Sequence, residues 1–232
     1  MANFDGVFMR FLAVTIGLMM LSGTALQSMA QTDRANERLI FLGDSITQAG
    51  VGPNGYVTLF RKLLEDQEKH SGMEVIGAGI SGNKVPDLQR RLQKDVLDKK
   101  PTLVVIYIGI NDVWHSQNGK GTSPNDFEAG LKDIIAKINE FGADVILCTP
   151  SVIGEKIDGS NPLDEMLEEY SEISRSVAEQ TGSNLIDLRV AFMNHLKKHQ
   201  NEESSGNVLT TDGVHLNQAG NAFVAEQMLK GL

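Results

Sequence analysis

Several short stretches of the sequence carry side chains of the types that perform acyl transfer. They supply a hydroxyl, a glycine-rich backbone, a neutral amide, a carboxylate and an imidazole, at Ser45, Gly82, Asn111, Asp212 and His215. Acyl transfer needs a nucleophile, a base, a carboxylate that orients the base, and hydrogen-bond donors where negative charge develops. The sequence therefore predicts a serine-based site, if the fold brings these stretches together.

Each stretch also has a purely structural interpretation. Asp44 and Ser45 are both favoured at helix N-caps, and glycine and asparagine are common in turns. Asp212 and His215 could begin a helix or bind a metal ion. The remaining histidines show no metal-ligand spacing with this pair, so a metal site is the weaker interpretation. The occurrence of complementary groups at separate strand and loop ends favours catalysis.

The elements that must position these groups alternate between strands and helices. Apolar runs of strand length are found at 39–42, 73–78, 102–108, 144–148 and 184–188. Helical spacing of apolar residues is found between them at 56–64, 86–99, 125–141, 162–181, 190–198 and 217–232. Strands separated by helices require right-handed crossovers and a parallel sheet. We therefore predict a three-layer α/β/α sandwich whose sheet has about five strands in the flavodoxin-like order 2-1-3-4-5.

The amino terminus has the pattern of a secretory signal. Arg10 precedes the apolar run 11–21, and the small residues Ser28 and Ala30 follow. A membrane anchor is the alternative, but the run is shorter than the about 20 residues that span a bilayer. We therefore expect cleavage near Ala30, a secreted or periplasmic protein without stable membrane association, and one domain over 31–232.

Composition limits the partners. The formal net charge is −9, so nucleic acid and anionic lipid would be repelled. The single cysteine, Cys148, lies in an apolar run, which excludes an internal disulfide and favours a buried hydrophobic role.

The same stretches resemble the sequence blocks of the SGNH hydrolases, also called GDSL lipases and esterases. The blocks correspond to 43–45, 79–83, 109–112 and 212–215, so the resemblance spans almost all of 31–232. It implies the SGNH hydrolase fold and hydrolysis of esters without a metal or organic cofactor. One departure is Asn83, where many members have Asp; this affects only the polarity at the edge of the site.

The resemblance also implies roles for individual residues. Ser45, Asp212 and His215 match the triad. The oxyanion hole corresponds to the backbone N–H groups of Ser45 and Gly82 and the side-chain amide of Asn111. Because the imidazole must be neutral to act as a base, activity should rise with pH through roughly 6 to 7.

Neighbouring residues receive lesser roles. We interpret Asp44 and Asp112 as hydrogen-bonding supports for their loops. Trp114 and His115 follow the third block and are candidate substrate-binding residues. The equal alternative is a loop anchored by packing of the tryptophan.

The substrate is predicted from general features. An interfacial lipase would show an exposed amphipathic helix rich in Phe, Leu and Trp, whereas this sequence holds one Trp, in a short loop. We therefore expect a short-chain ester on a small molecule or polysaccharide, such as an acetylated sugar. The alternatives are a lysophospholipase or thioesterase of the same family, or a catalytically silent glycan-binding protein that keeps the fold.

Overall fold

The computed structural model describes residues 37–65, 67, 72–199 and 207–232. The predicted signal, residues 1–30, lies outside these ranges. None of the helices in the described ranges has the length and apolar character required to cross a bilayer.

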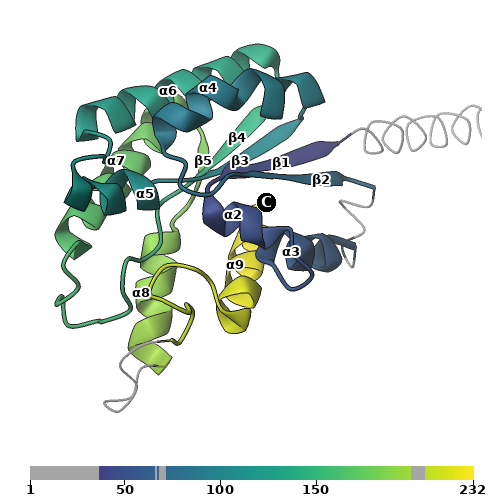
Figure 1. The fold of residues 1–232 in the computed structure, drawn as a ribbon. Helices are drawn as coiled ribbons and strands as arrows, with labels where there is room; N and C mark the ends of the chain where they lie inside the picture. The colour runs from purple at the N-terminus through teal and green to yellow at the C-terminus, as the bar shows by residue number, and fades with distance from the viewer. Residues whose placement is uncertain (1–36, 66, 68–71, 200–206) are drawn as a thin grey trace, which may run out of the picture.

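A parallel sheet forms the centre of the protein (Figure 1). Its strands are β1 (Arg38–Gly43), β2 (Glu74–Gly79), β3 (Leu103–Tyr107), β4 (Asp144–Cys148) and β5 (Asn184–Ile186). They are ordered β2-β1-β3-β4-β5, and every pairing is parallel. The predicted strand order is therefore confirmed.

Helices cover both faces of the sheet (Figure 1). One face carries α4 (Val85–Asp95), α6 (Pro124–Phe141) and α7 (Asp164–Thr181). The other carries α3 (Tyr56–Glu65), α8 (Leu188–His199) and α9 (Gln218–Lys230). The predicted three-layer sandwich is thus confirmed.

The central strand β1 is buried on both faces. Leu39 to Leu42 have no exposed surface, and the Phe41 ring packs edge-on against Tyr56 and Phe60 of α3. A strand covered on both sides needs apolar residues at successive positions, which explains its unbroken hydrophobic run.

The structure corrects two details of the prediction. Two short helices, α2 (Ser45–Gly50) and α5 (Ile110–Trp114), follow β1 and β3, where the sequence pattern predicted no helix. The last strand ends at Ile186, because the Asp187 carboxylate accepts a hydrogen bond from the Val190 N–H (3.0 Å). This bond caps α8, which begins at Leu188.

Candidate active site

Three strands end at the same level beside the candidate site. Gly43, the last residue of β1, pairs with Gly79 of β2 and with Tyr107 of β3. The loops that leave these strands therefore emerge together. This carboxyl edge is where open α/β sheets bind ligands.

Ser45 is the first residue of α2. The Asp44 carboxylate caps this helix by accepting a hydrogen bond from the Ile46 N–H (2.9 Å). The Ser45 N–H lies in the first turn, where backbone donors have no acceptor within the helix. The sequence allowed either Asp44 or Ser45 to cap this helix, and the structure shows that Asp44 is the cap. The Ser45 hydroxyl is therefore not used for capping.

Ser45 is linked to His215 and Asp212 by a chain of hydrogen bonds. Its Oγ lies 3.0 Å from His215 Nε2, and His215 Nδ1 lies 2.7 Å from Asp212 Oδ2. The other Asp212 oxygen accepts hydrogen bonds from the N–H groups of Val214 (3.0 Å) and His215 (2.8 Å). Ser45 is therefore brought together with His215, 170 residues further along the chain, and with its near neighbour Asp212.

The charge of Asp212 sets the proton positions in this chain. Although partial burial opposes it, hydrogen bonds from the His215 ring and backbone hold the Asp212 pKa below its usual range. An ionised carboxylate only accepts hydrogen bonds, so Nδ1 of His215 carries a proton. In the neutral ring, Nε2 is then an acceptor, directed at the Ser45 hydroxyl.

Asn111 connects the other two strand ends. It is buried, and its Nδ2 donates to the Asn83 carbonyl (3.1 Å) and, over a longer distance, to Asp44 Oδ2 (3.3 Å). The amide therefore lies between the residue before Ser45 and the residue after Gly82. Gly82 itself has φ +76°, and no atom lies within 4 Å of the position that a Cβ would occupy.

Two buried carboxyl groups support these loops, as we expected. Burial raises the pKa of Asp44 to about 7, and the nearby Asp112 contributes to the increase. Burial likewise raises the pKa of Asp112 to about 6, and its Oδ1 accepts a hydrogen bond from the Val85 N–H (3.1 Å). Asp112 thereby joins helix α5, which follows β3, to the start of α4.

Of the two candidate substrate-binding residues, the structure places Trp114 beside the histidine. The Trp114 and His215 ring centroids lie 6.4 Å apart, and the indole is half-buried. His115 begins the 3₁₀ turn His115–Asn118. Within the described part of the chain, its ring makes no aromatic contact with the triad.

Two residues that support the site, Arg91 and Glu155, were not predicted from the sequence. The Arg91 guanidinium donates to the carbonyls of Gly43 (2.7 Å) and Ala78 (2.9 Å) and to Asn83 Oδ1 (2.7 Å). It therefore ties two strand ends to the Gly82 loop. Arg91 lies three residues after Leu88, so helical periodicity places it near the buried face of α4, and this spacing could have indicated its role. Glu155 lies in a loop, where no periodicity can indicate burial.

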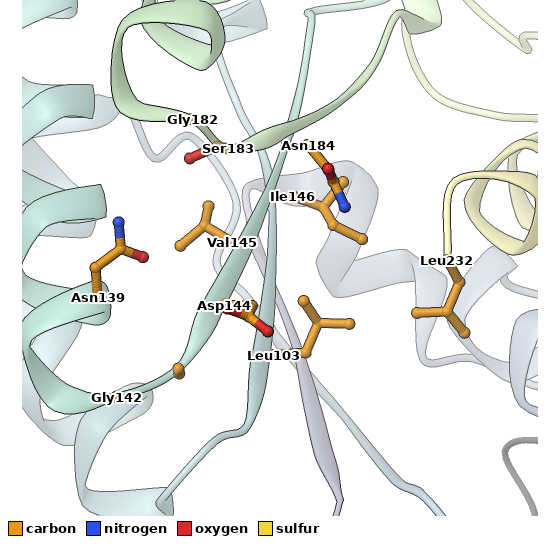
Figure 2. Close-up of a pocket in the computed structure, with 11 residues that line it drawn as sticks. Leu103, Asn139, Gly142, Asp144, Val145, Ile146, Gly182, Ser183, Asn184 and Leu232 are labelled. Carbon is orange, nitrogen blue, oxygen red and sulfur yellow. The ribbon is translucent and has the colours of Figure 1, made fainter.

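A hollow of about 580 Å³ lies elsewhere, at the opposite edge of the sheet. Figure 2 shows Leu103, Asp144 and Asn184 around it, and these residues begin β3, β4 and β5. The amino ends of parallel strands are not where this architecture binds ligands. The candidate active site is therefore the carboxyl edge.

Comparison with known proteins gives consistent matches. Residues 41–223 match the GDSL-like Lipase/Acylhydrolase family. An acetylxylan esterase of Geobacillus stearothermophilus is 32% identical over 213 residues, covering 84% of this chain and 94% of the relative. The crystal structure of the acetyl xylan esterase AlAXEase superposes with a TM-score of 0.81 at 45% identity, covering 84% of this chain and 99% of that one. LAE5, an α/β hydrolase from the metagenome of Lake Arreo, gives 0.74 at 29% identity, with 84% and 94% coverage.

Proposed function

The chain belongs to the GDSL-like lipase/acylhydrolase (SGNH) family and is an esterase, and we propose that it hydrolyses short-chain esters, above all acetyl esters of carbohydrates. The observation that carries the chemistry is the hydrogen-bonded chain from Asp212 through His215 to Ser45. The acetylxylan esterases among its relatives support the choice of substrate.

In the proposed mechanism, His215 Nε2 takes the Ser45 proton as Oγ attacks the ester carbonyl. Asp212 holds the ring in the required tautomer and stabilises its positive form. The tetrahedral intermediate collapses when the imidazolium protonates the leaving alcohol, which leaves an acyl group on Ser45. A water molecule, deprotonated by the same histidine, then releases the acid and restores the hydroxyl.

The developing oxyanion requires donors that are already in place. We assign them to the backbone N–H groups of Ser45 and Gly82 and to the Asn111 amide. The 3.3 Å contact from Asn111 to Asp44 is the longer of its two, so that proton is the one available to a substrate oxygen. Gly82 has a positive φ, and the space beside its Cα is open, so a ligand can approach this stretch of backbone closely.

Trp114 is the proposed contact for the substrate. Its ring beside His215 offers a flat apolar surface close to the reacting bond. We expect Trp114→Ala to raise KM for an acetylated sugar more than for a nitrophenyl ester, and His115→Ala to have the smaller effect.

Export is also part of the proposal, since acetylated polysaccharides lie outside cells. The sequence pattern over 1–30 supports it. Expression of the full chain in a secreting host, followed by mass spectrometry of the product, tests it. Loss of residues 1–30 is expected, and an intact amino terminus in the cell extract would contradict export.

The principal test is a series of nitrophenyl esters of increasing acyl length, run beside acetylated xylan. We expect kcat/KM to be highest for acetate and to fall as the chain lengthens. Rates that rise towards long acyl chains would instead identify a lysophospholipase or thioesterase. Labelling by a fluorophosphonate, abolished by Ser45→Ala, checks that the serine is activated, and its absence would favour a glycan-binding protein.

A further inference from the structure

The histidine of the triad lies in a segment with little regular structure. Between α8 and α9, the described residues 207–217 contain one isolated bridge, Thr210 with Leu216. A hydrogen bond from the Thr211 N–H to the His215 carbonyl (2.8 Å) maintains the local turn. These bonds shape the segment but do not attach it to the sheet.

Leu209 and Val214 of this segment are buried in the core, and its polar attachment comes from Glu155, in the loop between β4 and α7. This carboxylate is only 4% exposed. Its Oε1 accepts hydrogen bonds from the N–H groups of Leu209 (2.8 Å) and Thr210 (2.6 Å) and from the Thr210 hydroxyl (2.8 Å), and its Oε2 accepts one from the Val208 N–H (2.6 Å). Donors from three consecutive residues therefore converge on one carboxylate.

The same loop also holds the turn that separates Asp212 from His215. Thr210 Oγ1, which donates to Glu155, accepts a hydrogen bond from the Gly213 N–H (3.1 Å). On the other side, the Gly154 N–H donates to the Gly213 carbonyl (2.8 Å). Both polar groups of the Gly213 backbone are thus connected to Gly154 and Glu155.

We propose that Glu155 is a positioning residue of the esterase, whose carboxylate holds 208–213 against the body of the protein so that His215 stays in hydrogen-bond reach of Ser45. The inference rests on the proposed function of that histidine. A misplacement of about 1 Å in a catalytic group can lower the rate about 10²-fold. Both carboxylate oxygens are needed as acceptors, because the NH₂ group of an amide would direct its own donors at one of the converging N–H groups.

The test compares Glu155→Ala and Glu155→Gln with Asp187→Asn as a matched control. Asp187 is also a loop carboxylate that accepts several hydrogen bonds, from Arg175, Thr149 and Val190, but none of these partners lies in 207–217. The measurements are Tm, and kcat and KM for nitrophenyl acetate well below each Tm.

We expect Glu155→Ala to lower kcat by about 10²-fold with KM within about threefold. Glu155→Gln should recover part of the loss, because one oxygen still accepts the bonds that Oε1 receives. Asp187→Asn should lower Tm and leave kcat within about twofold of the wild type. A folded Glu155→Ala protein with nearly normal kcat, or an equal kcat loss in the control, would overturn the proposal.

Two further measurements keep the test decisive. If Glu155→Ala does not fold, Thr210→Val removes the hydroxyl that links Glu155 to Gly213 and keeps the three backbone bonds, so a smaller fall in kcat is expected, and an unchanged kcat would overturn the proposal. The proton on His215 Nδ1, shared with Asp212, should give a far-downfield ¹H resonance that broadens or shifts in the Glu155 variants and not in the control. This resonance can be measured without turnover. If the wild type is inactive, the proposed esterase activity is refuted, but the resonance still tests the positioning role of Glu155. If the resonance is unchanged in the Glu155 variants, only the positioning role is refuted.

Discussion

At the scale of single residues, two aspartates beside Ser45 have opposite electrostatic environments. Asp212 is partly exposed, and its hydrogen bonds to His215 lower its pKa. Asp44 is buried, and burial raises its pKa to about 7. An aspartate side chain therefore serves as an anion on one side of the hydroxyl, at Asp212, and as a loop support that is uncharged below about pH 7 on the other, at Asp44.

The assignment of Asn111 to the oxyanion hole predicts a specific loss. Asn111→Ala should lower kcat by about 10²-fold to 10³-fold with little change in KM, because the donor acts mainly on charge that develops in the transition state. Steady-state kinetics on nitrophenyl acetate measure this. Asn139→Ala, an exposed amide on α6 at the other edge of the sheet, is the control. A normal kcat in Asn111→Ala would remove that residue from the site.

Burial of Asp44 predicts a pH-dependent stability. Its folded pKa, about 7, exceeds the ordinary value of 3.8, so the folded state binds the proton more tightly than the unfolded state. Its contribution to the free energy of unfolding is therefore present below pH 4 and is lost as the pH rises to about 7. The asparagine side chain of the Asp44→Asn variant cannot ionise, so this loss does not occur in it. In the wild type, the loss in the free energy of unfolding is up to about 4 kcal/mol.

Urea unfolding of the wild type and Asp44→Asn at pH 5 and pH 8 measures the difference. We expect the variant to gain stability relative to the wild type between these two values. Asp112 is unchanged in both proteins, so its own titration largely cancels from the comparison. A constant difference across the range would show that Asp44 is not protonated in the folded protein.

At the scale of elements, the position of Ser45 depends on close packing of α2 against β2. A Cβ added to Gly79 would lie 2.1 Å from the Gln48 nitrogen and 2.5 Å from the Thr47 carbonyl carbon. Both are backbone atoms, so a side chain cannot be accommodated by a rotamer change. The helix that carries the nucleophile would have to move.

Gly79→Ala should therefore lower kcat by about 10²-fold, as expected for displacement of a reacting group. Gly142→Ala is the matched control, because Gly142 has φ +96° and no atom near a Cβ, at the end of α6. That variant should lose about 1 kcal/mol of stability through backbone strain and keep its kcat. Equal activity in the two variants would argue against a role for α2 packing.

The sequence predicted the elements whose pattern is long enough to be recognised. The run at 103–107 is continuously apolar because β3 is covered on both faces, and α6 and α7 each repeat their buried positions over several turns. Helices α2 and α5 have at most six residues, too few to show a period. Glu155 could not be found, because its partners follow it by more than fifty residues and depend on the fold.

At the scale of the whole molecule, the site is assembled from segments that follow β1, β2 and β3 and from the segment between α8 and α9. Ser45 and His215 are 170 residues apart in the sequence and meet at the carboxyl edge. The rule that parallel strands direct their following loops to one side predicted the positions of Ser45, Gly82 and Asn111, whereas the role of His215, between α8 and α9, was implied by the resemblance to the family. The exact contacts depend on side chains such as Arg91, which bind several strand ends at once.

The overall charge predicts how the enzyme distinguishes polymers. With a formal net charge of −9, the protein repels an anionic chain such as acetylated pectin but has no such effect on a neutral acetylated xylan. Raising the ionic strength from about 0.01 M to 0.15 M shortens the Debye length from about 30 Å to about 8 Å, which screens the repulsion.

We therefore expect kcat/KM for acetylated pectin to rise several-fold over that range of salt, while the values for neutral acetylated xylan and nitrophenyl acetate stay constant. Acetate release measured at each salt concentration tests this, and nitrophenyl acetate controls for direct effects of salt on the triad. A parallel change in kcat/KM for all three substrates would place the salt effect in the catalytic step.

A constant kcat/KM for acetylated pectin would contradict the predicted repulsion. Only charges within about a Debye length act on the approaching polymer. The charges near the site would then differ in sign or density from those of the molecule as a whole.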